Sequence, residues 1–122
     1  MIRHYVHDVE QKIDDLEYLI KNKIINIQFP SEEMCIIKGR LEFIEDSILD
    51  FRELVAINES PDYRFHWMDA NKRMIIRWDS APHHQVRTFP YHKHTKDGVS
   101  DSEIMNLISV LEIIESHILR EY

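Results

Sequence analysis

The chain has 122 residues, of which 43% are hydrophobic and 30% are charged, and its formal net charge is −7. This balance excludes a disordered chain, and the length suits one domain over residues 1–122 with a single hydrophobic core. No apolar run approaches the roughly 18 residues of a membrane helix, and no basic segment precedes an apolar one at the N-terminus, so we expect neither a membrane span nor a signal peptide. The single cysteine, Cys35, excludes an internal disulfide, and these features together favour a cytoplasmic protein.

Residues 2–21 have the apolar spacing of an amphipathic helix. Apolar side chains recur near the i, i+3, i+4 and i+7 positions, at Ile2, Tyr5, Val6, Val9, Ile13, Leu16, Leu19 and Ile20. The spacing then changes to a period of two at Ile25, Ile27 and Phe29, which predicts a strand. Pro30 and Ser31 are expected to end that strand.

Residues 34–57 alternate in a way that predicts a β-hairpin. A three-residue loop at 45–47 places apolar side chains opposite one another, for example Leu41 opposite Phe51. The same register places Glu53 on the apolar face, opposite Gly39. Because a buried carboxylate needs a partner, Glu53 is interpreted as a buried ion-pair partner, a catalytic carboxylate or a residue at the frayed end of the sheet.

Residues 62–79 predict a second hairpin, with a four-residue loop at 69–72. One face of this hairpin is apolar and aromatic, with Tyr63, Phe65, Trp67, Met74, Ile76 and Trp78. The other face is polar, with Arg64, His66, Arg73, Arg77 and Asp79. This register opposes Arg64 with Arg77, and like charges directly across a ladder are unfavourable. We therefore expect Asp79, another acid or a bound anion to offset the repulsion.

The segment SAPHHQVRTFPYHKH, residues 80–94, contains four of the eight histidines. If residues 91–94 are extended, His92 and His94 point the same way. Such a pair could provide two ligands of a zinc site, completed by Asp79, His83 or His84. It could equally provide the base and the acid of a proton-transfer reaction, since histidine titrates near neutral pH. We expect acid–base chemistry, with no metal and no other cofactor.

The C-terminal region predicts a second helix, from about residue 100 to the end. Ser100 and Glu103 have the spacing of a capping box, and Val99 and Ile104 that of a hydrophobic staple. The buried stripe of this helix is expected at Ile104, Leu107, Ile108, Leu111, Ile114 and Ile118. The order of elements predicts an α+β fold, a mainly antiparallel five- or six-stranded sheet with the N-terminal and C-terminal helices packed on its apolar face.

Charge is unevenly distributed along the chain. Residues 62–96, which we call the cationic centre, have a net charge of +4 before five histidines are counted, whereas the remaining residues sum to −11. A cationic centre within an acidic frame is typical of an anion-binding site, and a phosphate backbone is the obvious ligand.

Cleavage of RNA needs a base for the 2′-hydroxyl, an acid for the departing 5′-oxygen and cations around the phosphate. The sequence offers candidates for each role. The candidate catalytic residues are His83, His92, His94 and Glu53. The candidate phosphate-binding residues are Arg64, His66, Arg77, His84 and Lys93.

The stretches ILDFREL, YRFHWMD and RWDSAPHHQVRTFPYHKH, in this order and spacing, resemble the TumE toxins of bacterial and archaeal toxin–antitoxin pairs. The resemblance covers residues 48–94 in detail and has a compatible helix after it. It falls on Glu53, Tyr63, His66, Asp69, Arg77, Asp79, Pro82, His83, His84, Pro90, His92, Lys93 and His94. Two departures lie beside the candidate site: Ser80 replaces an expected asparagine, and residues 85–87 replace a more proline-rich run.

The resemblance implies a small intracellular toxin that a helix-turn-helix antitoxin neutralises, without specifying its reaction. We expect the antitoxin to cover the cationic centre with acidic or extended segments. The expected substrate is RNA or another phosphate-bearing molecule, and a homodimer is compatible with this interpretation. Two alternatives remain open: a non-catalytic module that recognises a partner protein through its acidic helices, and a metal-dependent nuclease or transferase that uses Asp79 and the histidines.

Overall fold

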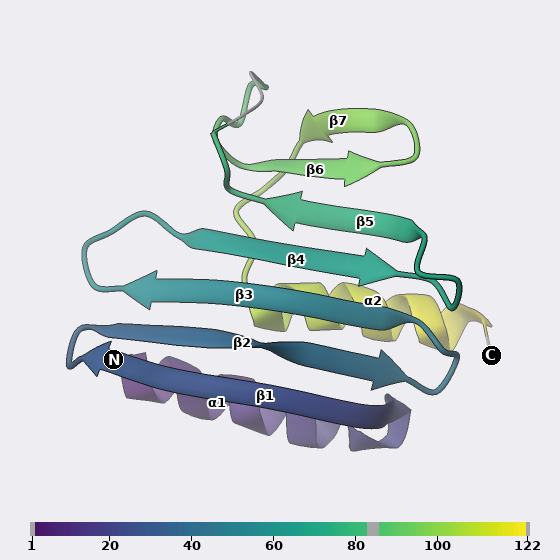
Figure 1. The fold of residues 1–122 in the computed structure, drawn as a ribbon, viewed down its shortest axis with the longest axis horizontal. Helices are drawn as coiled ribbons and strands as arrows, with labels where there is room; N and C mark the ends of the chain where they lie inside the picture. Colours follow the sequence, from purple (N-terminus) through teal and green to yellow (C-terminus); the bar gives the residue numbers. More distant parts are fainter. Residues whose placement is uncertain (1, 83–85, 122) are drawn as a thin grey trace.

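The computed structural model describes residues 2–82 and 86–121, which form a meander of strands with a helix at each end (Figure 1). The elements in chain order are α1 (Ile2–Asp15), the short 3-10 turn η1 (Glu17–Leu19), β1 (Ile20–Ser31), β2 (Met34–Phe43), β3 (Ile48–Ala56), β4 (Asp62–Met68), β5 (Met74–Asp79), β6 (His92–Thr95), β7 (Gly98–Asp101) and α2 (Leu107–Glu121).

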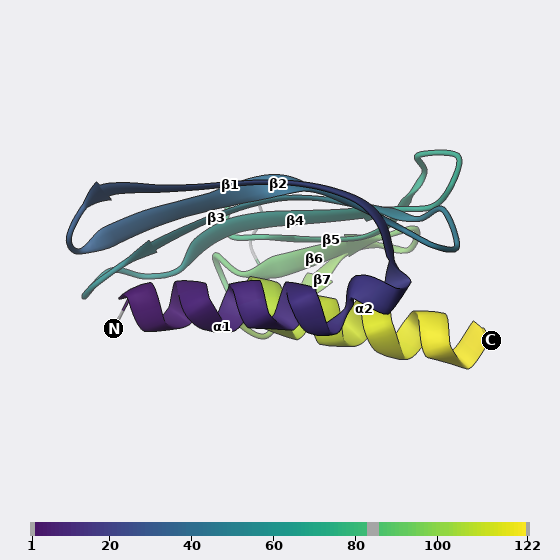
Figure 2. The same cartoon turned by 90° about the horizontal axis from the view of Figure 1, so that it is seen from below.

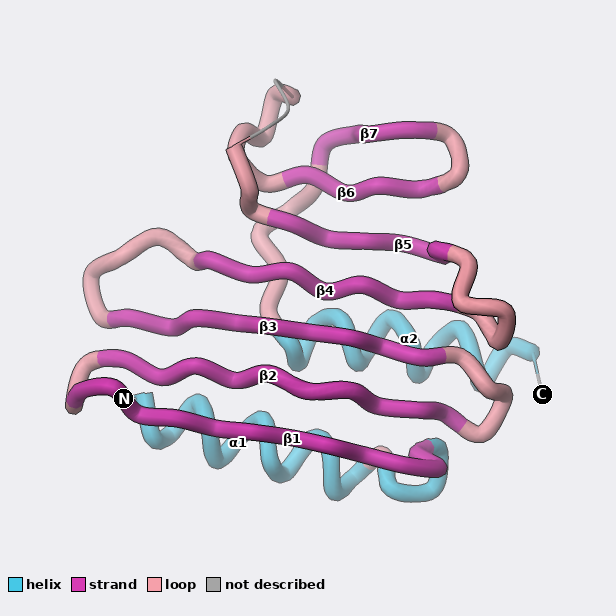
Figure 3. Tube along the Cα trace, viewed as in Figure 1, coloured by secondary structure: helices cyan, strands magenta, loops and turns pink. Residues whose placement is uncertain are grey.

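All the described strands form one antiparallel sheet, in which each strand pairs with the next one along the chain, in the order β1 to β7 (Figure 3). Both helices lie on the same side of this sheet (Figure 2). We call that side the helix face and the opposite side the open face. The α+β fold with both helices on the apolar face is confirmed, and the sheet has seven strands rather than five or six.

The hydrophobic core lies between the helix face and the two helices. Strand alternation directs Leu49, Phe65 and Trp67 into it, and each of these side chains is at most 1% exposed. From α2, the predicted stripe packs against them, with Leu107, Leu111, Ile114 and Ile118 at 0% exposure. Burying one such side chain contributes about 1.5–3 kcal/mol, so this core holds both helices against the helix face of the sheet.

Two predicted helix boundaries are wrong. The first helix ends at Asp15, not at residue 21, because β1 pairs with β2 from Ile20 onward. The second helix begins at Leu107, because residues 98–101 pair with β6 instead of starting a helix. The capping pair lies six residues later than predicted, at Asn106 and Ser109 instead of Ser100 and Glu103. Asn106 Oδ1 accepts the Ser109 N–H at 2.8 Å, and Ser109 Oγ accepts the Asn106 N–H at 2.9 Å. Ile104 is consequently 57% exposed and lies outside the buried stripe.

Both predicted hairpin registers are wrong by two residues. In the first hairpin Leu41 lies opposite Leu49, and Glu53 lies opposite Ile37 rather than Gly39. The turn keeps the predicted length of three residues but lies one residue earlier, at 44–46, where the Phe43 N–H donates to the Ser47 carbonyl at 2.9 Å. A shift of two residues leaves every side chain on its face, so matching apolar residues across the ladder could not detect it.

Two features move the register of the second hairpin. Its turn is one residue shorter than predicted, because the Asp69 N–H donates to the Arg73 carbonyl, and an irregularity lies between Trp67 and Met68. Arg64 therefore lies opposite Asp79, not opposite Arg77, and His66 lies opposite Arg77. The predicted repulsion between Arg64 and Arg77 across the ladder is absent, so it no longer supports a bound anion.

Candidate functional site

Side chains from all seven described strands form two rows across the open face, and all of them except Ile24 and Val99 are polar. The registers align the first row as Asn26, Lys38, Arg52, Arg64, Asp79, His92 and Asp101. They align the second row as Ile24, Arg40, Asp50, His66, Arg77, His94 and Val99. On each strand the members of the two rows are two residues apart. Side chains two residues apart in a strand point the same way, so both rows share one face of the sheet.

The two histidines of β6 point the same way, as predicted. Their ring centroids are 4.9 Å apart, with the planes at 72°. His92 is 1% exposed, and its Nδ1 lies 2.8 Å from the Pro90 carbonyl oxygen. Since a carbonyl only accepts, Nδ1 of His92 carries a proton. The segment before β6 therefore sets the orientation of the ring.

Arg77 contacts His94 and lies close to Asp79. Its Nη2 donates to Nε2 of His94 at 3.1 Å, and its Nε lies 3.8 Å from Oδ2 of Asp79. Within the described ranges, the buried Nε makes no hydrogen bond. Asp79 is 9% exposed, and its Oδ1 accepts the Ala81 N–H at 2.6 Å. The arginine fork thus has a buried donor available for an anion, on the side of the sheet that carries the histidines.

His66 completes the group on the β4 side. Burial lowers the pKa of its imidazole, and the positive charges of Arg64 and Arg77 lower it further. Its Nδ1 is buried and has no hydrogen-bond partner among residues 2–82 and 86–121. We call His66, Arg77, Asp79, His92 and His94 the histidine–arginine cluster.

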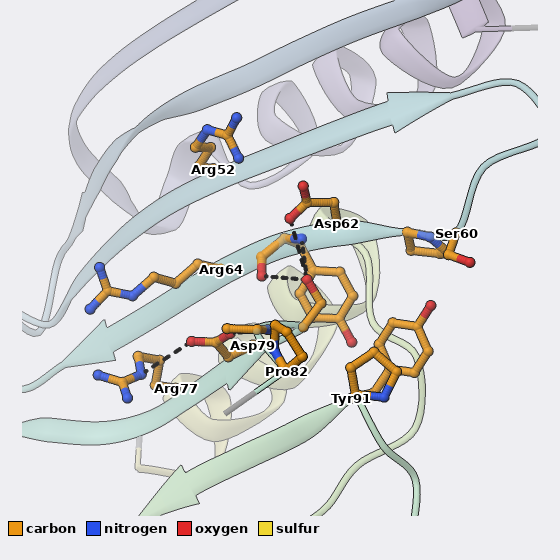
Figure 4. A pocket seen from close by; sticks show the side chains of 13 residues that line it. Arg52, Ser60, Asp62, Arg64, Arg77, Asp79, Pro82 and Tyr91 are labelled. Carbon is orange, nitrogen blue, oxygen red and sulfur yellow. Dashed lines mark hydrogen bonds and ion pairs between the residues drawn. The ribbon is translucent and has the colours of Figure 1, made fainter. Parts of the chain in front are cut away.

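A shallow hollow of about 770 Å³ adjoins the cluster on the open face (Figure 4). Arg52, Arg64 and Arg77 reach it from three neighbouring strands, and Tyr91 borders it from the segment before β6. A phosphate group in this hollow would meet guanidinium groups within reach of the histidines, which suits phosphate chemistry.

Glu53 does not join the cluster. It lies on the helix face, 5% exposed, and the Tyr5 hydroxyl donates to its two carboxylate oxygens at 2.7 and 2.9 Å. Burial raises the pKa of Glu53 to about 7, although hydrogen bonds from Tyr5 and from the Leu107 backbone act in the opposite direction. Glu53 links α1, β3 and the start of α2, which is a structural role.

The structure places none of the other predicted residues Lys93, His83, His84 and Asp69 in the histidine–arginine cluster. Lys93 alternates with His92 and His94, and therefore points to the other face of the sheet. His83 and His84 lie outside the described residues. Asp69 accepts the N–H groups of Asn71 and Arg73, and so closes the turn between β4 and β5.

Ser80, one of the two departures from the resemblance, lies among the described residues. Its Oγ accepts the Tyr63 N–H at 3.0 Å, so it joins the end of β5 to the start of β4. The serine thus performs a backbone-linking role that needs only a short acceptor side chain.

Sequence reasoning missed Lys38 and Arg52 as members of the site. Both alternate with apolar residues in the stretches IIKGR and DFREL, so their place on the polar face could have been inferred. Their alignment with Arg64 depends on two registers and was not visible in the sequence.

The cluster also contains a possible metal-binding group. One ligand atom from each of Asp79, His92 and His94 lies within 4.8 Å of the other two. Two imidazoles and a carboxylate suit zinc and related transition metals. The adjacent guanidinium of Arg77 opposes a cation at this place, because like charges repel at close range in a partly buried site.

In a comparison with known protein families, the family model described as Toxin TumE matches residues 7–121. The matched region runs from α1 through the histidine–arginine cluster into α2. Neither a curated protein nor a solved structure matches the chain. Within the described part of the chain, neither helix has the length and apolar character needed to cross a lipid bilayer.

Proposed function

Since the chain belongs to the TumE toxin family, and is therefore a toxin whose partner is an antitoxin, we propose that it acts by cleaving RNA with His92 and His94 as acid and base. The observation that carries the proposal is the in-register placement of Arg77 and Asp79 beside these two histidines. Together they provide proton transfer and phosphate binding within one cluster.

His94 is assigned as the base, because its Nε2 already accepts a hydrogen bond from Arg77. When a phosphate takes the Arg77 donors, Nε2 is released to accept the proton of the 2′-hydroxyl. The 2′-oxygen then attacks phosphorus while the bond to the 5′-oxygen breaks. The products are a 2′,3′-cyclic phosphate and a 5′-hydroxyl end.

His92 is assigned as the acid that protonates the departing 5′-oxygen. Its register neighbours are Asp79 and Asp101, whose carboxylates offset the charge of an imidazolium, and the Pro90 carbonyl accepts from its Nδ1. Arg77 stabilises the charge that develops on the phosphorane oxygens. Losing one such donor typically costs about 3–4 kcal/mol of transition-state stabilisation.

The neutralising partner is proposed to be a helix-turn-helix antitoxin that covers the cationic centre with acidic or extended segments, in the cytoplasm. Arg52 and Arg64 are exposed on the open face, and no described element covers that face. A covering partner would therefore block the hollow and the histidines without disturbing the core.

A metal-dependent nuclease is the second candidate, favoured by the proximity of Asp79, His92 and His94. In that mechanism the ion would bind the phosphate and activate a water, instead of the histidines transferring protons.

The test is cleavage of a defined RNA by the purified toxin, with analysis of the product ends. We expect 2′,3′-cyclic phosphate and 5′-hydroxyl ends, no cleavage when the 2′-hydroxyls are methylated, and full activity in a chelator. Cleavage of methylated RNA, or loss of activity in the chelator with recovery on adding zinc or manganese, would support the metal-dependent candidate instead.

A further inference from the structure

Three cationic side chains lie side by side at the centre of the open face. Lys38, Arg52 and Arg64 occupy successive strands, each directly opposite the next. All three are exposed. Because adjacent strands are about 4.8 Å apart, the row spans roughly 10 Å at its base. Like charges directly across a ladder destabilise a sheet, so this arrangement is unfavourable unless an anion offsets it.

The neighbouring row shows how the same face neutralises a cation. Arg40 donates to both carboxylate oxygens of Asp50 at 2.6 and 2.8 Å, across the same pair of strands. Among residues 2–82 and 86–121, no carboxylate forms an ion pair with Lys38, Arg52 or Arg64. Across β2 and β3, therefore, the cation Arg40 has an ion-pair partner on the neighbouring strand, whereas Lys38 lies opposite another cation, Arg52.

The three cations line two adjacent hollows of the open face. A hollow of about 580 Å³ over β1 to β4 is lined by Lys38, Arg52 and Arg64, among others. The hollow of about 770 Å³ beside the histidine–arginine cluster also includes Arg52 and Arg64. The two hollows share these arginines in their linings, so they are adjacent on the open face.

We propose that Lys38, Arg52 and Arg64 form a phosphate track, which binds the backbone of single-stranded RNA on one side of the scissile phosphate. The link between this track and the reaction at His92 and His94 rests on the proposed function, whereas the track itself rests on charge and register. A single strand is the fitting ligand, because attack by a 2′-hydroxyl in line with the departing oxygen needs a flexible nucleotide. An RNA duplex holds its nucleotides in another geometry.

The track recognises phosphates rather than bases. The large aromatic residues of β4 and β5, namely Phe65, Trp67 and Trp78, are buried on the helix face. They therefore cannot stack on bases at the open face. Binding through guanidinium and ammonium groups depends strongly on salt and little on sequence.

The test uses a fluorescent oligouridine of about twelve nucleotides, within the usual range of single-strand binding sites. All its 2′-hydroxyls are methylated, so it cannot be cleaved by 2′-hydroxyl attack. Affinity is measured by anisotropy at several salt concentrations for Lys38→Gln, Arg52→Gln and Arg64→Gln. Each substitution should weaken binding severalfold and reduce the salt slope by about 0.7, the value for one phosphate contact in a single strand.

Lys23→Gln is the matched control. Lys23 is an exposed lysine in β1 that pairs with Leu41, and it therefore lies on the helix side of the sheet. The control removes the same charge, so its slope should equal that of the wild type. Equal losses in Lys23→Gln and in the track variants would overturn the proposal, because net charge alone would then explain binding.

A second measurement separates this inference from the proposed function. If the wild type binds the methylated oligonucleotide with the predicted slopes but cleaves no RNA, the track stands and the proposed reaction fails. If the wild type cleaves RNA while Arg52→Gln and Arg64→Gln bind as the control does, the track is overturned. Loss of antitoxin binding in those two variants, with RNA binding retained, would also overturn it and assign the row to the antitoxin.

Discussion

Both faces of the sheet contain buried ionisable groups, but the hydrogen bonding of these groups differs between the faces. On the helix face, the carboxylate of Glu53 receives hydrogen bonds from Tyr5 at both oxygens. On the open face, the buried Nδ1 of His66 and Nε of Arg77 have no hydrogen-bond partner among the described residues. A satisfied buried group stabilises a fold, whereas buried donors and acceptors left over beside a hollow are suited to a ligand. The sequence made Glu53 a candidate catalytic residue together with the histidines. Its hydrogen bonds in the structure distinguish it from the histidine–arginine cluster.

The largest expected effect is on activity, at the open face. His94→Ala should reduce RNA cleavage by about 10²–10⁴-fold and relieve growth arrest on expression, because it removes the proposed base. Its melting temperature should stay close to that of the wild type, since His94 is only partly buried.

His4→Ala is the control for the His94 substitution, because His4 is an exposed histidine on α1. It should keep both toxicity and the melting temperature. Undiminished toxicity of His94→Ala would remove this residue from the mechanism, and a collapse of its melting temperature would give it a structural role.

The next effect is the pH dependence of stability, at the helix face. The folded protein raises the pKa of Glu53 from 4.5 to about 7, so the folded state keeps a proton that the unfolded chain releases. The contribution of Glu53 is therefore fully present below pH 4.5 and is lost as the pH rises through about 7. This loss amounts to roughly 3 kcal/mol at most, at about 1.4 kcal/mol per pKa unit.

Urea unfolding at several pH values, for the wild type and Glu53→Gln, measures this contribution. The difference between the two proteins cancels other titrating groups, and it should grow in favour of the variant as the pH rises from about 5 to 8. A difference that is constant across this range would mean that Glu53 is ionised throughout.

A smaller effect is expected for the partner of Glu53. Tyr5→Phe removes the hydroxyl that donates to both oxygens, and should lower the free energy of unfolding by about 1–3 kcal/mol. Tyr18→Phe is the matched control, because the Tyr18 hydroxyl also donates to a carboxylate, that of Glu115 at 2.9 Å, but at an exposed place. It should cost about 0.5 kcal/mol or less, and equal losses in both variants would contradict the link through Glu53.

The smallest effect is expected for the ion pair of Arg40 and Asp50 on the open face. The pair of Arg40 and Asp50 is about 40% exposed on each side. Arg40→Gln should therefore lower stability by about 1 kcal/mol or less in urea unfolding, and less still at high salt. A greater loss would mean that this ion pair contributes strongly to holding β2 against β3. Arg40, which has an ion-pair partner, and Lys38 and Arg52, which have none among the described residues, would then differ in their effect on stability as well as in RNA binding.

The sequence by itself determined which side chains share a face. A period of two in β2 to β5 and a stripe near 3.6 in each helix follow from local backbone geometry, and they predicted the α+β fold, the buried aromatic residues and the common direction of His92 and His94. The motifs around these histidines also predicted the TumE family, which the family model confirms.

Only the tertiary structure decided which residues are neighbours across the sheet. A register shift of two residues keeps every face intact, so the sequence could not choose between Arg77 and Asp79 as the partner of Arg64, or align Lys38 with Arg52. Likewise, the partner of Glu53 is Tyr5, 48 residues away in the chain, and no local pattern connects them. Faces are determined by neighbouring residues of one strand, whereas pairings depend on turns, irregularities and packing that involve the whole chain.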